Sequence, residues 1–230
     1  GKSGVTARIK FKREGDGFLI EAICCPHTGA LLGFKCRADD TDEIEDPTGG
    51  DVSPTTKRCL AMLRRVGITG AWRTVWCDNL FSSLKFCWYA WKQSKVKVCG
   101  VLRKNRGGAS ECIIKEETKK EEILKAKDEE HKDPTTHAIV GRGRLKVKAF
   151  NVNGTEVTGG TFGVVCFGFY DDKPFNMLST AHSTVVFMEK KRKVWDYEQK
   201  CYAEIEYFRL VIVDEYNHLM DGVDLQDQLR

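Results

Sequence analysis

Short apolar runs with the two-residue alternation of β-strands, separated by turn residues, constrain the fold of this 230-residue chain more than any other feature. Two of them, Phe18–Cys25 and Ala30–Arg37, flank the turn-forming stretch Pro26–Gly29 and predict a hairpin near the start of the chain. With 41% hydrophobic residues, a chain of this length can bury one continuous core. Further strand-like runs follow at Trp72–Cys77, Val96–Leu102, Leu145–Phe150, Thr161–Tyr170, Pro174–Ala181 and Glu204–Val213.

Two segments between these runs have the spacing of amphipathic helices. The first is bounded by Ser53 as its N-cap and by Gly67 as its stop, and the second begins at Ser82 or Ser83. Helices that alternate with strands in this way predict a mixed α/β fold with one core.

Composition narrows the class of protein further. The longest apolar block, Gly163–Tyr170, is far shorter than the roughly 18 residues of a membrane-spanning helix, so we expect no membrane partner. The 37 basic and 33 acidic residues leave a net charge of only +4, so affinity for a polyanion must come from charge placement. None of the ten cysteines are paired at the two-residue separation typical of structural zinc sites, and we expect a reducing compartment. We predict a single domain over residues 1–230, with residues 109–160 as an insertion.

Two carboxylates occupy positions from which a metal-dependent site can be assembled. Asp78 follows the strand-like run Trp72–Cys77, and Asp224 lies with Asp227 where the last helical segment begins. Mg²⁺ prefers oxygen ligands and takes few of them from protein, and two such ions can activate a nucleophile and stabilise the leaving oxygen of a phosphodiester. The alternative is that Asp78 caps the following helix and that Asp224 and Asp227 stabilise a helix N-terminus.

Four strings in the sequence are informative when they are taken together. They are CDNLFSS at Cys77–Ser83, GVLRKNRG at Gly100–Gly107, DDKP with LSTAHS at Asp171–Pro174 and Leu178–Ser183, and the stretch Tyr216–Leu229 that contains MDGVDLQDQL. Together they resemble the transposase domain of the piggyBac family. The resemblance covers the chain from about Phe18 to Arg230 and implies a ribonuclease-H-like mixed sheet with flanking helices and an inserted charged segment. It also implies a parent activity, the metal-dependent cutting and joining of DNA at transposon ends.

The resemblance assigns roles to particular residues. It implies that Asp78, Asp224 and Asp227 are the catalytic aspartates, and that Asp78 and Asp224 bind Mg²⁺ where the site is functional. The chain departs from the family at the first metal-binding aspartate, at the end of the opening strand, where Cys25 stands instead. A thiol that is neutral near pH 7 is a soft ligand and replaces an anionic oxygen poorly for Mg²⁺.

We therefore expect a catalytically degenerate transposase core that binds DNA. One alternative is an active transposase in which another carboxylate, such as Glu21 or one from the acidic stretch Asp39–Asp51, completes the site. Another alternative is a structural or protein-interaction remnant of the family.

Two groups of basic residues are candidates for DNA contact. Arg103, Lys104 and Arg106 form a compact loop whose following glycines let the backbone approach a phosphate. The second group alternates along a strand, so its side chains point to one face and could follow a DNA backbone: Arg142, Arg144, Lys146 and Lys148. A solvated turn and an exposed sheet face explain the same two groups.

Other side chains have both a functional and a structural interpretation. The cluster Lys190–Lys193 has the composition of a nuclear import signal, so we expect nuclear localisation, and a homodimer is compatible with the sequence. Trp195 is a candidate exposed stacking platform, and we expect a hydrogen-bonded structural role for His182. The remaining tryptophans fit the core faces of their elements: Trp72, Trp76, Trp88 and Trp91.

Overall fold

The computed structural model describes most of the chain in nine pieces, and the statements below concern those residues. They are residues 6–8, 16–18, 20–36, 52–102, 145–158, 162–170, 174–196, 198–220 and 222. None of the helices in these pieces is long and apolar enough to cross a membrane. The mixed α/β class predicted from the sequence is confirmed.

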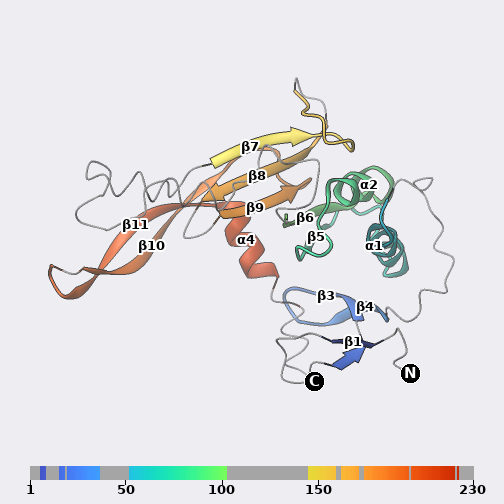
Figure 1. Ribbon diagram of the computed structural model, residues 1–230, viewed down its shortest axis with the longest axis horizontal. Coiled ribbons are helices and arrows are strands. Elements are labelled where there is room, and N and C mark those ends of the chain that lie inside the picture. The colour runs from blue at the N-terminus through green and yellow to red at the C-terminus, as the bar shows by residue number, and fades with distance from the viewer. Residues whose placement is uncertain are drawn as a thin grey trace.

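A five-stranded mixed sheet forms the main body (Figure 1). Its first two strands are parallel, and the other neighbours are antiparallel. The strand order is β5 (Thr74–Cys77), β6 (Lys97–Val101), β9 (Pro174–Ser179), β8 (Val164–Tyr170) and β7 (Leu145–Phe150).

Helices cover both faces of this sheet. Helices α1 (Pro54–Arg65) and α2 (Leu84–Ser94) lie side by side and share one hydrophobic cluster with Val98 of β6. Helix α4 (Val211–Leu219) belongs to a second cluster that contains Cys99, the next residue of β6. Because successive side chains of a strand point to opposite faces, the sheet divides the continuous core that the sequence predicted into two layers.

Both N-terminal helices begin at the predicted capping residues. The Ser53 hydroxyl accepts a hydrogen bond from the Thr56 backbone N–H at 3.3 Å, and the Ser83 hydroxyl accepts one from Phe86 N–H at 3.1 Å. Gly67 follows α1 with a φ of +69°, a left-handed conformation that glycine adopts readily.

The predicted N-terminal hairpin is confirmed as strands β3 (Ile20–Cys24) and β4 (Leu31–Cys36), which form a two-stranded sheet. In its turn, Cys25 N–H donates to the Ala30 carbonyl at 2.8 Å and Gly29 N–H donates to the Cys25 carbonyl at 2.9 Å. Earlier in the chain, two short strands pair with each other, β1 (Thr6–Arg8) and β2 (Asp16–Phe18).

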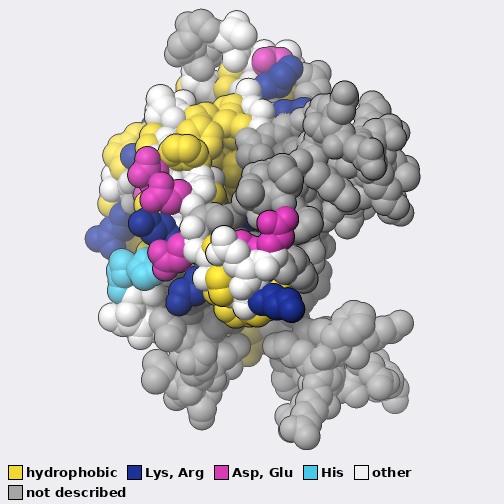
Figure 2. Space-filling model, turned by 90° about the vertical axis from the view of Figure 1, so that its left-hand side faces the viewer, with side chains coloured by type: hydrophobic (Ala, Val, Ile, Leu, Met, Phe, Trp, Pro, Cys, Tyr) yellow, Lys and Arg dark blue, Asp and Glu magenta, His cyan; other side chains and the backbone are white. Residues whose placement is uncertain are grey.

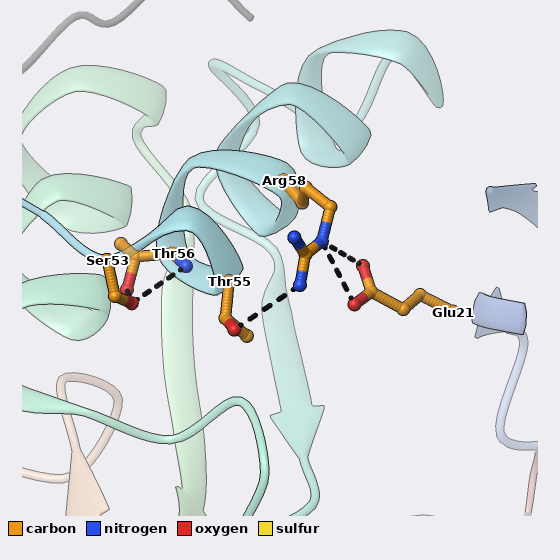
Figure 3. A network of polar contacts seen from close by, with 5 residues as sticks. All are labelled: Glu21, Ser53, Thr55, Thr56 and Arg58. Atoms are coloured by element: carbon orange, nitrogen blue, oxygen red, sulfur yellow. Dashed lines mark hydrogen bonds and ion pairs between the residues drawn. The ribbon is translucent and has the colours of Figure 1, made fainter. Parts of the chain in front are cut away.

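A buried ion pair attaches this hairpin to α1 (Figure 3). The Arg58 Nε atom lies 3.1 and 3.2 Å from the two carboxylate oxygens of Glu21, and the guanidinium also donates to the Thr55 hydroxyl at 3.4 Å. Both side chains of the pair are at least 95% buried, which is unusual for charged groups.

The C-terminal part differs from its prediction. The strand expected over Glu204–Val213 is observed as β11 (Cys201–Leu210), and the chain turns helical at Val211. The β-branched run at residues 211–213 favours a strand locally, but burial of Ile212, Val213 and Tyr216 against the sheet selects the helix. Residues 223–230, where we expected the last helix, lie outside the described residues, as do residues 171–173 of the DDKP string.

A strand that the sequence did not predict pairs with β11 along its whole length. It is β10 (Phe187–Asp196), and it contains the basic cluster Lys190–Lys193. Lys190 pairs with Asp214 at 3.1 Å and Lys191 with Glu206 at 3.3 Å. On the side of the molecule from which this hairpin projects, acidic and basic side chains are interspersed around hydrophobic ones (Figure 2). The cluster is therefore part of a charge-balanced hairpin.

Removing one partner of the buried pair should destabilise the protein strongly. We expect Glu21→Ala to lower the free energy of unfolding by about 3–5 kcal/mol, because Arg58 would remain buried without a counterion. Urea unfolding followed by circular dichroism measures the change. Lys191→Ala, which removes an exposed pair, is the matched control and should cost at most about 0.5 kcal/mol. Equal losses in the two variants would contradict this role of the pair.

Candidate functional site

Asp78 lies at the C-terminal end of β5, directly after the buried residue Cys77, and its side chain is exposed. Its carbonyl oxygen accepts hydrogen bonds from Phe81 N–H at 3.0 Å, from Ser82 N–H at 3.2 Å and from the Ser82 hydroxyl at 3.1 Å. Ser83 caps α2, so the alternative in which Asp78 caps that helix is wrong. The turn therefore leaves the Asp78 carboxylate at the edge of the sheet.

A glycine on the neighbouring strand makes this turn sterically feasible. Gly100 of β6 pairs with Cys77 of β5. A Cβ atom on Gly100 would lie 2.1 Å from the Ser82 hydroxyl oxygen and 2.7 Å from the Cys77 carbonyl oxygen. The string that begins at Gly100 therefore supports the Asp78 turn directly, a role that sequence reasoning missed because it depends on a contact between two strands.

Cys25 and Asp78 line the same cavity. This cavity has a volume of about 380 Å³, and its other lining residues include Met220 and Gly222. Gly222 packs tightly, because a Cβ atom there would lie 2.9 Å from Pro26 Cα and 3.0 Å from the Cys25 carbonyl oxygen. The structure thus brings the ends of β3 and β5 together with the residue two positions before Asp224. Asp224 and Asp227 themselves lie outside the described residues.

Glu21 also lines this cavity, but Arg58 already binds its carboxylate. Moving that carboxylate to a metal ion would leave the Arg58 guanidinium buried without a counterion, at a cost of several kcal/mol. The structure therefore argues against Glu21 as the replacement ligand. The acidic stretch Asp39–Asp51 lies outside the described residues.

The described part of the site does not fit Mg²⁺. It contains no group of three or more His, Cys, Asp or Glu side chains arranged to hold a metal ion. Asp78 supplies hard oxygen atoms, whereas Cys25 supplies sulfur, and Mg²⁺ selects oxygen ligands.

The turn after β3 favours a negative charge on Cys25. The Thr28 hydroxyl is the main cause, followed by hydrogen bonds from the backbone N–H groups of His27 and Thr28, and together they lower the pKa of the Cys25 thiol. Burial has the opposite effect on Cys77, whose thiol pKa it raises. Thr28 is a second residue that sequence reasoning missed, although a threonine in the turn after a strand is a recognisable signal.

Most of the predicted DNA-contact residues lie outside the described residues: Arg103, Lys104, Arg106, Arg142 and Arg144. Lys148 of β7, the last residue of the alternating basic row, forms an ion pair with Glu156 at 2.7 Å. The hydrogen-bonded role expected for His182 is confirmed, since its Nδ1 lies 2.9 Å from the Ser179 hydroxyl and its Nε2 lies 3.0 Å from the Glu215 carboxylate.

The predicted positions of the tryptophans are correct in part. Trp195 is 40% exposed, as expected for a residue on the surface. Trp72 was expected on a core face, but it is 42% exposed because its φ of +53° turns the chain before β5 begins. Residues 72 and 73 are consequently not part of the strand predicted over Trp72–Cys77.

Comparisons with known proteins identify the same relationship that the sequence strings predicted. A family model described as Transposase IS4 matches residues 5–230. A cryo-EM structure of a piggyBac transposase synaptic complex with hairpin DNA has the same fold, with a TM-score of 0.59 and 16% identity. The match covers all of this chain and 37% of that chain, so this chain spans little more than a third of that transposase. No curated protein sequence matches.

The environment of Cys25 predicts the pH dependence of its reactivity. Only the thiolate reacts with iodoacetamide, so a lowered pKa moves the rise in alkylation rate to a lower pH than for an ordinary thiol. Thr28→Val removes the hydroxyl that contributes most and should move this rise to higher pH, whereas Thr28→Ser should retain the wild-type profile. Mass spectrometry of the Cys25 peptide across pH measures the rate. Identical profiles for the valine variant and the wild type would contradict the assignment.

Proposed function

The chain belongs to the transposase family described as Transposase IS4. From this membership we propose that it is a transposase core that binds DNA but no longer cleaves it, because Cys25 occupies the position of a metal ligand. A single observation carries the proposal. Cys25, the residue at the position of the first metal-binding acid, lines the same cavity as Asp78, the residue at the position of the second. In this proposal the Cys25 thiol therefore replaces a carboxylate at one of the metal-ligand positions of the site.

The chemical consequence follows from the ligand types. In enzymes that cleave phosphodiesters with two ions, bound Mg²⁺ activates a nucleophilic oxygen and stabilises the leaving oxygen. Here the pair Cys25 and Asp78 offers one hard anionic group where the family pattern has two. We infer that the chain retains the shape of the site but binds divalent ions too weakly for cleavage.

Retention of DNA binding is the second part of the proposal. The described strand β6 ends at Val101, beside the end of β5 that carries Asp78. Arg103, Lys104 and Arg106 follow Val101 within five residues, so the sequence puts three basic residues directly after this strand end. Cations beside a phosphodiester site position a DNA backbone without reading its sequence. The piggyBac transposase of similar fold is bound to hairpin DNA, which supports the same class of ligand here.

The proposed DNA ligand bears on where in the cell the protein acts. We propose nuclear localisation because the ligand is DNA. The Lys190–Lys193 cluster adds less to this proposal than its composition suggests, since Lys190 and Lys191 form ion pairs within a hairpin. A homodimer remains a prediction.

Restoring the missing acid should distinguish a degenerate site from an active one. We expect the wild-type chain not to nick supercoiled plasmid DNA in Mg²⁺ or Mn²⁺, and Cys25→Asp to gain nicking that Asp78→Ala abolishes, because the turn around residue 25 already stabilises an anion. Cys25→Ala is the matched control and should remain inactive. Robust nicking by the wild-type chain that depends on Asp78 would refute the proposal that the site is inactive. It would support the alternative in which another carboxylate completes the metal site.

Binding to duplex DNA should depend steeply on salt. Neutralising three phosphates contributes about −2.7 to the slope of log K against log salt, so replacing Arg103, Lys104 and Arg106 together by alanine should flatten the slope by up to that amount. Fluorescence anisotropy with duplex DNA at several salt concentrations measures it. Replacing Lys190, Lys191 and Lys193 by alanine removes the same charge elsewhere and should flatten it less. Absence of salt-dependent binding would favour the interaction-remnant alternative.

A further inference from the structure

Positive charge is concentrated in one part of the chain. Residues 52–102, which form α1, β5, α2 and β6, contain nine basic residues and one acidic residue, Asp78, a local charge of +8 in a chain whose net charge is +4. A module with this charge attracts a polyanion. Asp78 lies at the C-terminal end of β5, so the other end of the strand has no nearby acid from this module.

An exposed aromatic cluster lies at that other end of β5. Trp72 is 42% exposed and its ring centroid is 5.6 Å from that of Trp91 on α2. Trp91 in turn stacks on Phe162, with centroids 3.5 Å apart and an interplanar angle of 13°. Trp91 and Phe162 therefore support the Trp72 ring from within, while much of that ring remains open to solvent.

The backbone holds Trp72 in this position. Its φ of +53° is rare for a bulky side chain, and Lys95 on the facing turn has the same value. Two hydrogen bonds join the turns: Trp72 N–H donates to the Lys95 carbonyl at 2.8 Å, and Gly70 N–H donates to the Ser94 carbonyl at 2.7 Å. An unfavourable conformation that neighbouring contacts maintain is a feature of functional sites more often than of ordinary surface turns.

Lys95 places a cation beside the exposed ring, and Lys92 is a second exposed lysine three positions before it. The Lys95 ammonium lies 5.6 Å from the centroid of Trp72 and donates to the Lys92 carbonyl at 3.2 Å. Within the described residues, no carboxylate pairs with Lys92 or Lys95. The described acid nearest to Phe162 in sequence, Glu156, pairs with Lys148. A stacked base makes a stronger contact with a tryptophan than an exposed ammonium does, and a displaced Lys95 can move to a phosphate.

We propose that Trp72, Trp91, Lys92 and Lys95 form a binding surface for an unpaired segment of a DNA strand. Only an unpaired strand offers the open face of a base to Trp72, and its phosphates match the two lysines. None of these four residues lines the Cys25 cavity, whose lining on this segment begins at the next residue, Arg73. This inference and the proposed function both concern DNA as the ligand, but they rest on different residues.

Short oligothymidine, which forms no duplex, is the probe, and fluorescence anisotropy at low salt is the measurement. We expect Trp72→Gly to weaken binding about 5- to 100-fold through loss of base stacking. Glycine adopts positive φ without strain, so this variant should keep its thermal stability and separate binding from folding. Trp72→Phe retains a stacking ring and should bind within about threefold of the wild type.

The matched control is Phe208→Ala, because Phe208 is an exposed aromatic residue on β11 of the β10–β11 hairpin. It should bind oligothymidine as the wild type does. Wild-type affinity in Trp72→Gly, an equal loss in Phe208→Ala, or no binding by the wild type would each overturn the inference. Duplex DNA is measured in parallel and should bind Trp72→Gly normally. Trp72-dependent oligothymidine binding without any duplex binding would sustain this inference and remove the proposed function.

Discussion

The buried pair between Glu21 and Arg58 is the contact on which the geometry of the site depends. In the described part of the chain, no backbone ladder joins the β3–β4 hairpin to the five-stranded sheet, so side-chain contacts must place it. Arg58 belongs to α1, which packs on the sheet through Leu60 and Leu63. Glu21 lies four residues before Cys25, so its attachment to α1 fixes the end of β3 relative to the end of β5. The carboxylate closest in sequence to the position of the missing ligand thus has a structural role that opposes its use as a ligand.

The surroundings of Cys25 remain suited to an anion although the side chain is a thiol. The Thr28 hydroxyl and two backbone N–H groups donate toward residue 25, and such donors stabilise a carboxylate as well as a thiolate. Gly222 approaches the same turn to within contact distance. The turn and its neighbours can therefore accommodate an anionic side chain at position 25, whether a carboxylate or a thiolate. This supports the proposal that position 25 is a former metal-ligand position.

The features that the sequence predicted correctly depend on neighbouring residues. Ser53, Ser83 and Gly67 mark helix ends through contacts within one turn, and Cys25 to Gly29 forms a hairpin turn for the same reason. Long-range features were missed: Glu21 and Arg58 are 37 positions apart, and nothing local identifies them as partners. The helix at residues 211–219 was missed because its first residues favour a strand locally, whereas burial against the sheet selects the helical conformation. The catalytic assignment came from the family resemblance and stays a prediction, and of its positions the structure describes Cys25 and Asp78, which line one cavity.

Cleavage and DNA affinity depend on different residues, and the two can therefore be lost separately. Cleavage with two metal ions needs several hard ligands around one point, so the proposed loss of cleavage requires a change of only one side chain. Affinity for a polyanion is a sum over many weak phosphate contacts, and the +8 charge of residues 52–102 does not involve Cys25. Much of that charge faces solvent, because five of the nine basic side chains are exposed: Arg64, Arg65, Arg73, Lys92 and Lys95. The proposed loss of cleavage is therefore compatible with retained affinity for a polyanion.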